Sequence, residues 1–209
     1  MLYELFLSTF ITFFVVIDPI GCAPIYAGLT SGASATARRS MAIRAVVVST
    51  IIIFVFALFG EQLLHALSIS LNAFRIAGGI MLFLIALEMV FEKRTQRRED
   101  RAQMVMESPE IEDVSVFPMA MPMIAGPGSI ASVMLLMAEN QGIERSLTIL
   151  AAVGVILLLT LAALLAAGPI MRLLGTRIEA VITRLLGVLL SAFAIQFVID
   201  GVRASFIGA

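Results

Sequence analysis

The sequence predicts an all-α protein that crosses a membrane several times. Of its 209 residues, 60% are hydrophobic and only 14% are charged, whereas soluble domains are about 45–50% apolar and about 25% charged. The mean hydropathy is +1.05, and the apolar residues gather in six stretches long enough to cross a bilayer. Such a chain cannot cover its surface with polar groups, so these observations exclude a water-soluble enzyme.

Each of the six stretches is predicted to be one transmembrane helix. A bilayer core needs about 20 apolar residues per helix, and lipid cannot satisfy exposed backbone groups, so each span should be helical. The stretches do not alternate as the strands of a membrane β-barrel do. In chain order, the predicted spans are Leu5–Leu29, Met41–Phe59, Phe74–Phe91, Val116–Ala138, Ser146–Ala167 and Ile178–Ile199.

The basic residues predict the orientation of these spans. No basic residue precedes Arg38, so the first stretch lacks the positive start of a signal peptide and is expected to remain in the chain. Arginine and lysine gather after the first, third and fifth helices, at Arg38, Arg39, Arg44, Lys93, Arg94, Arg97, Arg98, Arg101, Arg172 and Arg177. Because basic loops face the cytoplasm, both termini are predicted to face outward.

The chain divides into two halves joined by a charged linker. We expect a first three-helix unit at 1–91, a cytoplasmic linker at 92–115 and a second three-helix unit at 116–209. The mixed charge of the linker indicates a solvated connection, and a docking site for a partner is the alternative.

The two halves resemble each other weakly. The spacing that aligns Arg75 with Arg184 also aligns Gly78 with Gly187, and a spacing one residue shorter places Pro19 over Pro127. Because each half holds three spans, the second half should enter the membrane upside down. The sequence therefore predicts an inverted repeat, which in many secondary transporters places a binding site at the interface of the repeats.

The first helix of each half is interrupted by residues that break helices. Proline removes a backbone donor and glycine permits unusual backbone conformations. Unwound backbone is tolerated at membrane depth only where protein or a wet cavity surrounds it. Breaks at corresponding places favour a binding site over simple kinks. The predicted substrate-binding residues at the breaks are Asp18, Pro19, Gly21, Pro24, Gly126, Pro127, Gly128 and Ser129.

The breaks should expose helix ends to a small solute. The free N–H groups after Pro127 and after Pro24 would hold a carboxylate, and the hydroxyl of Ser129 would donate nearby. Asp18 and the carbonyls of the unwound turns would face an ammonium group. For Asp18, the alternative is an N-cap of the following half-helix.

Arg75 completes the predicted substrate-binding residues. It lies at the outer end of its helix, where it would bind a carboxylate or take part in gating. The simpler alternative is that its side chain reaches the membrane interface. Glu88, near the other end of the same helix, is expected to be an interfacial carboxylate.

Three segments carry a family resemblance. Asp18–Pro24, Phe74–Ile80 and Met121–Ser129 resemble the MarC family of bacterial inner-membrane proteins, and the resemblance covers essentially the whole chain. It implies a multi-pass inner-membrane protein of transporter type, with both termini on the periplasmic side, since some relatives are described as small neutral amino acid transporters. The positions that match the family motifs are Asp18, Pro19, Gly21, Pro24, Arg75, Gly78, Gly79, Gly126, Pro127, Gly128 and Ser129.

Together these patterns favour a secondary transporter of small neutral amino acids or similar polar metabolites. A proton or a sodium ion could couple through Asp18. An uncoupled channel or facilitator and a non-transporting membrane scaffold are the alternatives. We expect no enzyme activity, no cofactor and no nucleic-acid partner, because catalytic pairs, metal-ligand clusters, a nucleotide-binding loop and a basic composition are missing from the sequence.

Overall fold

The computed structural model describes residues 1–106 and 113–207, and within these ranges every regular element is helical. The elements are α1 (Leu2–Ile17), α2 (Pro19–Leu29), α3 (Ala35–Ala66), α4 (Leu71–Val90), α5 (Lys93–Met106), η1 (Ser115–Ile124), α6 (Pro127–Glu139), α7 (Ile143–Leu165) and α8 (Ala167–Ile207). The predicted all-α class is therefore confirmed.

The described chain has five helical stretches long and apolar enough to cross a membrane, and the bent pair η1–α6 makes a sixth. Each spanning helix begins before its predicted apolar limit, because helical backbone continues past the apolar core of a span. For example, α3 starts at Ala35, where the Ser34 side chain accepts a hydrogen bond from the N–H of Ala37 at 3.2 Å. Ser70 caps α4 in the same way through Ala73.

Two connections differ from the sequence-based expectation. The segment expected to link the last two spans is helical backbone, because α7 ends at Leu165 and α8 begins at Ala167. The expected solvated linker at 92–115 contains α5, which packs against α2, α4 and η1. Arg98 of α5 is buried, so this part of the linker is not a solvated chain. Residues 107–112 of the linker lie outside the described residues.

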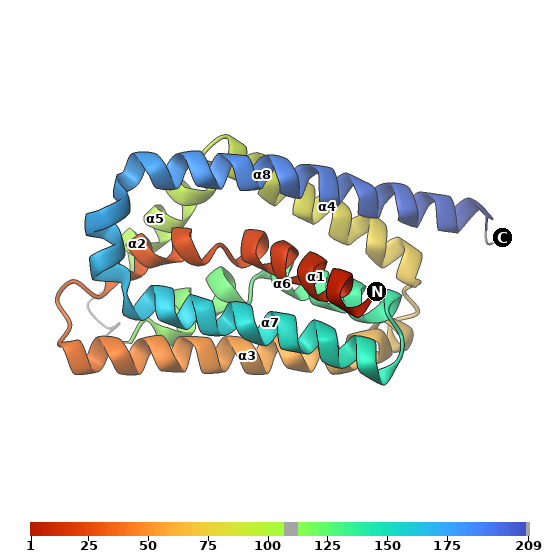
Figure 1. Ribbon diagram of the computed structural model, residues 1–209, viewed down its shortest axis with the longest axis horizontal. Coiled ribbons are helices and arrows are strands. Elements are labelled where there is room, and N and C mark those ends of the chain that lie inside the picture. Colours follow the sequence, from red (N-terminus) through yellow and green to blue (C-terminus); the bar gives the residue numbers. More distant parts are fainter. Residues whose placement is uncertain (107–112, 208–209) are drawn as a thin grey trace.

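The broken helices lie between two pairs of continuous helices (Figure 1). The pair α4 and α8 packs closely along one side, and α3 packs against α7 on the other. Helix α1 packs on α7, and η1 packs on α3; α2 contacts both α7 and α8, and α6 contacts both α3 and α4. Helix α1 begins and α8 ends at the same end of the bundle, where the N and C labels lie.

Glycines allow the close approach of α4 and α8. A Cβ on Gly79 would lie 2.8 Å from the carbonyl oxygen of Ala194, and one on Gly187 would lie 3.0 Å from that of Ala86. These distances leave no room for a side chain, so the two helices touch through their backbones. This agrees with the usual role of small residues between membrane helices.

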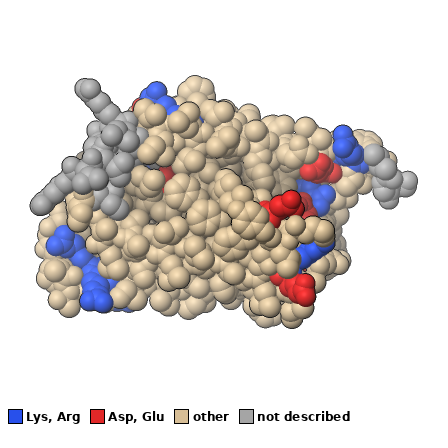
Figure 2. Space-filling view, viewed as in Figure 1, with Lys and Arg blue, Asp and Glu red and all other residues tan. Residues whose placement is uncertain are grey.

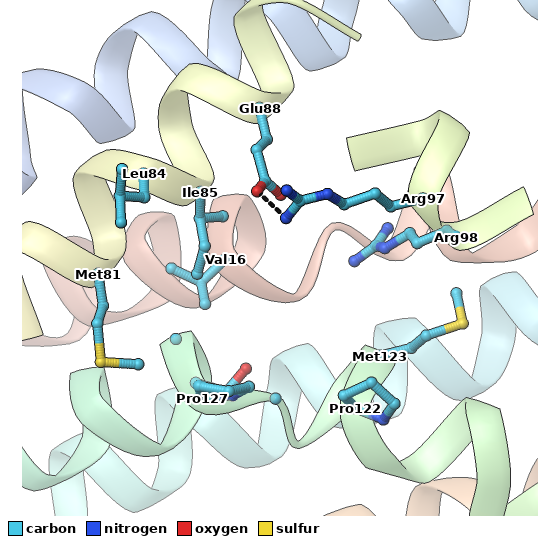
Figure 3. Close-up of a pocket in the computed structure, with 13 residues that line it drawn as sticks. Val16, Met81, Leu84, Ile85, Glu88, Arg97, Arg98, Pro122, Met123 and Pro127 are labelled. Carbon is cyan, nitrogen blue, oxygen red and sulfur yellow. Dashed lines mark hydrogen bonds and ion pairs between the residues drawn. The ribbon is translucent and has the colours of Figure 1, made fainter. Parts of the chain in front are cut away.

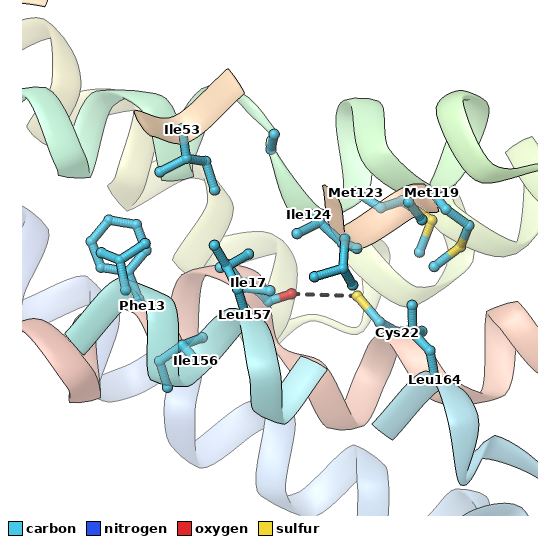
Figure 4. Packing of buried hydrophobic residues seen from close by; sticks show 14 of the residues in the cluster. Phe13, Ile17, Cys22, Ile53, Met119, Met123, Ile124, Ile156, Leu157 and Leu164 are labelled. Carbon is cyan, nitrogen blue, oxygen red and sulfur yellow. Dashed lines mark hydrogen bonds between the residues drawn. The ribbon is translucent and has the colours of Figure 1, made fainter. Parts of the chain in front are cut away.

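The buried residues form two clusters on either side of α1. One joins α1 to α2, α3, η1 and α7 around Phe13, Ile17 and Ile156 (Figure 4), and the other joins α1 to α4, α6 and α8 around Val16 and Leu82. Outside the core, many large apolar side chains are exposed along α3, α7 and α8. On the visible face the charged side chains gather towards the two ends of the molecule (Figure 2). An apolar band of this extent is suited to lipid contact.

Candidate functional site

The first break is a single residue between two half-helices. Helix α1 ends at Ile17, Asp18 has left-handed backbone angles of φ 58° and ψ 68°, and α2 starts at Pro19. Aspartate is among the few residues that adopt this conformation readily, and proline suits the first helical position because it has no N–H to satisfy. The helix therefore stops and restarts where the sequence predicts a break.

Asp18 caps the second half-helix with its own side chain. Its Oδ1 accepts a hydrogen bond from the N–H of Gly21 at 3.0 Å. A Cβ on Gly21 would lie 2.2 Å from Asp18 Oδ2, so only glycine leaves room for the folded-back carboxylate. The N-cap alternative stated above for Asp18 is thus the arrangement found. Pro24, in contrast, lies inside α2, and no half-helix starts after it.

Arg98 of α5 reaches into this first break. Its Nη1 lies 3.3 Å from Asp18 Oδ2, and its Nη2 donates to the carbonyl of Ile17 at 3.3 Å. The Arg98 side chain is 8% exposed and that of Asp18 is 4% exposed. The Cys22 Sγ also donates to the Ile17 carbonyl, at 3.5 Å (Figure 4). A guanidinium group thus neutralises both the carboxylate and the negative end of α1.

The second break is longer and begins inside η1. Phe117 and Met121 have extended backbone angles within η1, because each precedes a proline, whose ring disfavours the helical conformation of the residue before it. Helix α6 starts at Pro127, and the η1–α6 pair is bent by 51°. Ser129 Oγ bridges the break by donating to the carbonyl of Ile124 at 2.7 Å.

The N-terminus of α6 differs from that of α2 because no side chain caps it. Its N-cap residue is Gly126, where a Cβ would lie 2.3 Å from the carbonyl oxygen of Pro122. The first N–H groups of a helix have no partner within the helix, so those of Gly128 and Ser129 remain available to a ligand. They carry the positive end of the dipole of α6.

A cavity of about 310 Å³ opens at this uncapped helix end (Figure 3). Residues of α1, α4, α5, η1 and α6 line it: Val16, Met81, Leu84, Ile85, Glu88, Arg97, Arg98, Pro122, Met123, Gly126, Pro127, Gly128 and Ser129. On one wall Glu88 forms an ion pair with Arg97 (Figure 3). The cavity therefore combines apolar walls with one carboxylate, two guanidinium groups and free backbone donors, a lining suited to a small polar solute.

The predicted site residues divide into three groups in space. Gly126, Pro127, Gly128 and Ser129 line the cavity. The predicted residues of the first break, from Asp18 to Pro24, lie beside it and meet it through Arg98. Arg75 lies elsewhere: its Nε is 2.8 Å from Glu139 Oε1, at the far end of α6. Substrate binding by these residues remains a prediction.

Sequence reasoning missed the roles of Arg97 and Arg98, and it did not pair Glu88 with Arg97. Both arginines are on α5, within a segment expected to be a solvated loop, and Arg98 is far from Asp18 in the chain. Their only signal in the sequence is that they belong to the basic cluster that predicts a cytoplasmic loop. Among the described residues, no group of three or more His, Cys, Asp or Glu side chains is arranged to hold a metal ion.

A carboxylate also binds the backbone at the start of η1. Asp113 Oδ1 accepts a hydrogen bond from the N–H of Ser115 at 2.9 Å, and Asp113 Oδ2 lies 2.7 Å from Arg44 Nη1. Hydrogen bonding from Ser115, with a smaller contribution from the charge of Arg44, lowers the pKa of Asp113 although partial burial opposes this. The contact ties the end of the linker to α3.

Comparison with known proteins identifies the family. Residues 3–206 match the model of the MarC family of integral membrane proteins. A UPF0056 membrane protein of Methanocaldococcus jannaschii is 34% identical over 98% of both chains. The UPF0056 membrane protein YvbG of Bacillus subtilis is 34% identical over 99% of this chain and 98% of its own length.

A similar match comes from the UPF0056 membrane protein YhcE of Escherichia coli, which is 30% identical over 99% of this chain and 95% of its own. No solved structure matches this chain. The chain belongs to the MarC family of integral membrane proteins, so the resemblance seen in the three sequence segments is confirmed.

Proposed function

We propose that this MarC-family protein is a secondary transporter of small neutral amino acids or similar small polar metabolites. The observation that carries the proposal is the cavity beside the two breaks, into which the uncapped N-terminus of α6 opens. Discontinuous helices of this kind form the substrate sites of many secondary transporters. A cavity of about 310 Å³ is large enough for a molecule such as alanine.

The packing of the helices supports an inverted repeat of the two halves. In such a repeat, the first-half helices α1, α2, α3 and α4 correspond in turn to η1, α6, α7 and α8. The contacts of the two halves then match: α1 packs on α7 as η1 packs on α3. Likewise, α2 contacts α7 and α8 as α6 contacts α3 and α4. The close contact of α4 with α8 joins two equivalent helices, so it is symmetric in the repeat. Two such halves could rock against each other and expose the cavity to either side in turn.

A zwitterion suits the two kinds of group at the breaks. Its carboxylate would accept hydrogen bonds from the N–H groups of Gly128 and Ser129 at the positive end of α6. Its ammonium would face Asp18 and the carbonyl of Ile17, the position that Arg98 occupies in this structure. Asp18 is also the proposed group for a coupling proton or sodium ion.

The proposed location is a bacterial inner membrane, with both termini on the periplasmic side. The arginines on α5 and at the start of α3 would then face the cytoplasm, as the positive-inside rule expects. In this orientation, α5 lies at the cytoplasmic end of the cavity, and Arg75 and Glu139 lie near the periplasmic end of the bundle.

Uptake by proteoliposomes tests the transport function. We expect labelled alanine or glycine to enter vesicles that contain the protein faster than empty vesicles, and a proton or sodium gradient to increase the rate. Gly128→Val should reduce uptake at least tenfold, since a Cβ at Gly128 would already lie 2.7 Å from Ile85 Cδ1 inside the cavity. Gly154→Ala on α7 is the control, because no atom lies within 4 Å of its Cβ position.

Two outcomes would favour the alternatives. Flux that does not respond to any gradient would indicate an uncoupled channel or facilitator. Movement of alanine and glycine no faster than in empty vesicles, under every gradient, would reject transport of these solutes and favour a membrane scaffold.

A further inference from the structure

Arg98 occupies the position that a substrate cation would need. Its guanidinium lies 3.3 Å from the carboxylate of Asp18 and donates to the last carbonyl of α1, that of Ile17. These are the two acceptors expected to face the ammonium of a bound amino acid. The chain therefore supplies its own cation to the first break, while the anion-binding end of α6 stays open.

The contacts of Arg98 are suited to being broken. Charge-assisted hydrogen bonds between nitrogen and a carboxylate are usually about 2.7–2.9 Å long, and those from N–H to a carbonyl are about 2.7–3.2 Å long. Both contacts of Arg98 are longer, at 3.3 Å. The helix that carries Arg98 is polar along most of its length and is not one of the membrane spans. Its main contacts are with α2, α4 and η1, and the Arg98 side chain also reaches the last carbonyl of α1. Withdrawal of α5 would open the break without unfolding a span.

We propose that Arg98 is a tethered cation which closes the ammonium subsite formed by Asp18 and the Ile17 carbonyl, and that the ammonium of the substrate displaces it and releases α5. The proposal rests on the transport function proposed above. It adds the requirement that a substrate carry a positively charged amine, and it makes α5 a plug that stays in place until such a substrate arrives.

Cys22 provides a natural reporter of this plug. It is the only cysteine in the chain, it is fully buried, and its Sγ donates to the same Ile17 carbonyl as Arg98. A reagent that enters the break which Arg98 closes would therefore meet Cys22 there. Its reaction rate can be measured whether or not the protein transports anything.

The first experiment measures the reaction of Cys22 with 2-aminoethyl methanethiosulfonate in lipid nanodiscs, followed by mass spectrometry. We expect Arg98→Ala to increase the rate at least tenfold over the wild type. Lys93→Ala is the matched control, since it removes a positive charge from an exposed residue of α5 that does not line the cavity, and it should leave the rate within twofold. The double variant Asp18→Asn/Arg98→Gln removes both charges and leaves neither buried alone; it should also react at least tenfold faster than the wild type.

The second experiment tests displacement by the substrate amine. A spin label is attached to Glu99→Cys, an exposed position beside Arg98, in a Cys22→Ser background. We expect alanine at saturating concentration to increase the mobility of the label, and ethylammonium to do so at higher concentration. Propionate, which is alanine without its amine, should leave the mobility unchanged.

The outcomes separate this proposal from the transport function. Equal Cys22 rates in the wild type, Arg98→Ala and the double variant would overturn the plug even if uptake is observed. An equal response of the label to alanine and propionate would overturn competition at the ammonium subsite. If alanine is not transported but Cys22 becomes reactive in Arg98→Ala and ethylammonium mobilises the label, the plug stands and the assigned substrate is wrong.

Discussion

The two breaks both start a new half-helix, but they do so with different residues before the proline. At each, a half-helix begins with proline, Pro19 in α2 and Pro127 in α6. The residue before the proline is Asp18 in the first half and Gly126 in the second. Asp18 folds its carboxylate over the N–H of Gly21 and pairs with Arg98, whereas Gly126 leaves the end of α6 uncapped beside a cavity.

The difference shows how one local geometry can be used in two ways. A carboxylate at the N-cap neutralises the positive end of a helix from within the chain. A glycine at the same place leaves that charge to be neutralised by a ligand. The first break is therefore occupied by groups of the protein itself, and the second is the one free to bind an anion.

The largest effect is expected from Asp18→Ala. It removes the cap of α2 and leaves the buried guanidinium of Arg98 without a counter-charge, so the free energy of unfolding should fall by about 3–5 kcal/mol. Unfolding in mixed micelles with increasing denaturing detergent measures this change. The double variant Asp18→Asn/Arg98→Gln should recover most of the loss, because no charge is then left buried alone.

Glu88→Ala is the control for that comparison. It also breaks an ion pair of α5, but its partner Arg97 is 64% exposed, and exposed pairs contribute about 0–1 kcal/mol. If Asp18→Ala and Glu88→Ala lowered the unfolding free energy equally, the first break would not be the buried, charge-dependent structure described here.

Gly126→Ala should have an intermediate effect. Its new Cβ would lie 2.3 Å from a backbone oxygen, that of Pro122, and backbone cannot move aside as a side chain can. We expect the free energy of unfolding to fall by about 1–3 kcal/mol, the range for overpacked positions. Gly28→Ala in α2, where the Cβ position is empty within 4 Å, should not destabilise the protein. An equal loss for both variants would mean that the tight turn before α6 is not needed.

The smallest effect is expected from Asp113→Asn. Asp113, like Asp18, accepts a hydrogen bond from a backbone N–H and faces an arginine, but its side chain is 42% exposed. At neutral pH the variant should lose less than about 1 kcal/mol, as for other exposed pairs. The pKa of Asp113 is lowered in the folded protein, so its contribution is complete above the ordinary aspartate pKa and disappears as the pH falls through the lowered value.

The measurement is the difference in unfolding free energy between wild type and Asp113→Asn from neutral to acidic pH. This difference should shrink only in the acidic range, below about pH 4. A large difference at neutral pH would show that the greater exposure of Asp113 does not make its contribution to stability smaller than that of Asp18.

Much of the fold could be predicted from the chain alone. Span positions follow from apolar length, and both breaks follow from proline and glycine. The ends of the spans were less accurate: α8 begins at Ala167 and not at Ile178, since helical backbone continues where hydropathy falls. Pro24 was expected to start a half-helix, but Pro19 already satisfies that requirement and Pro24 is accommodated inside α2.

The sequence by itself determined where helices form and where they stop, because both depend on residues close together in the chain. A long apolar run forms a helix in lipid, since its backbone groups can pair only with each other. A proline stops or interrupts a helix through the missing N–H and the clash of its ring with the preceding turn. The tertiary structure alone decided which groups meet at the breaks. Arg98 contacts Asp18 from a helix that is far away in the chain. Arg75 forms an ion pair with Glu139 and does not line the cavity. Charges separated this far along the chain interact only after the helices have packed, so no local pattern could reveal their partners.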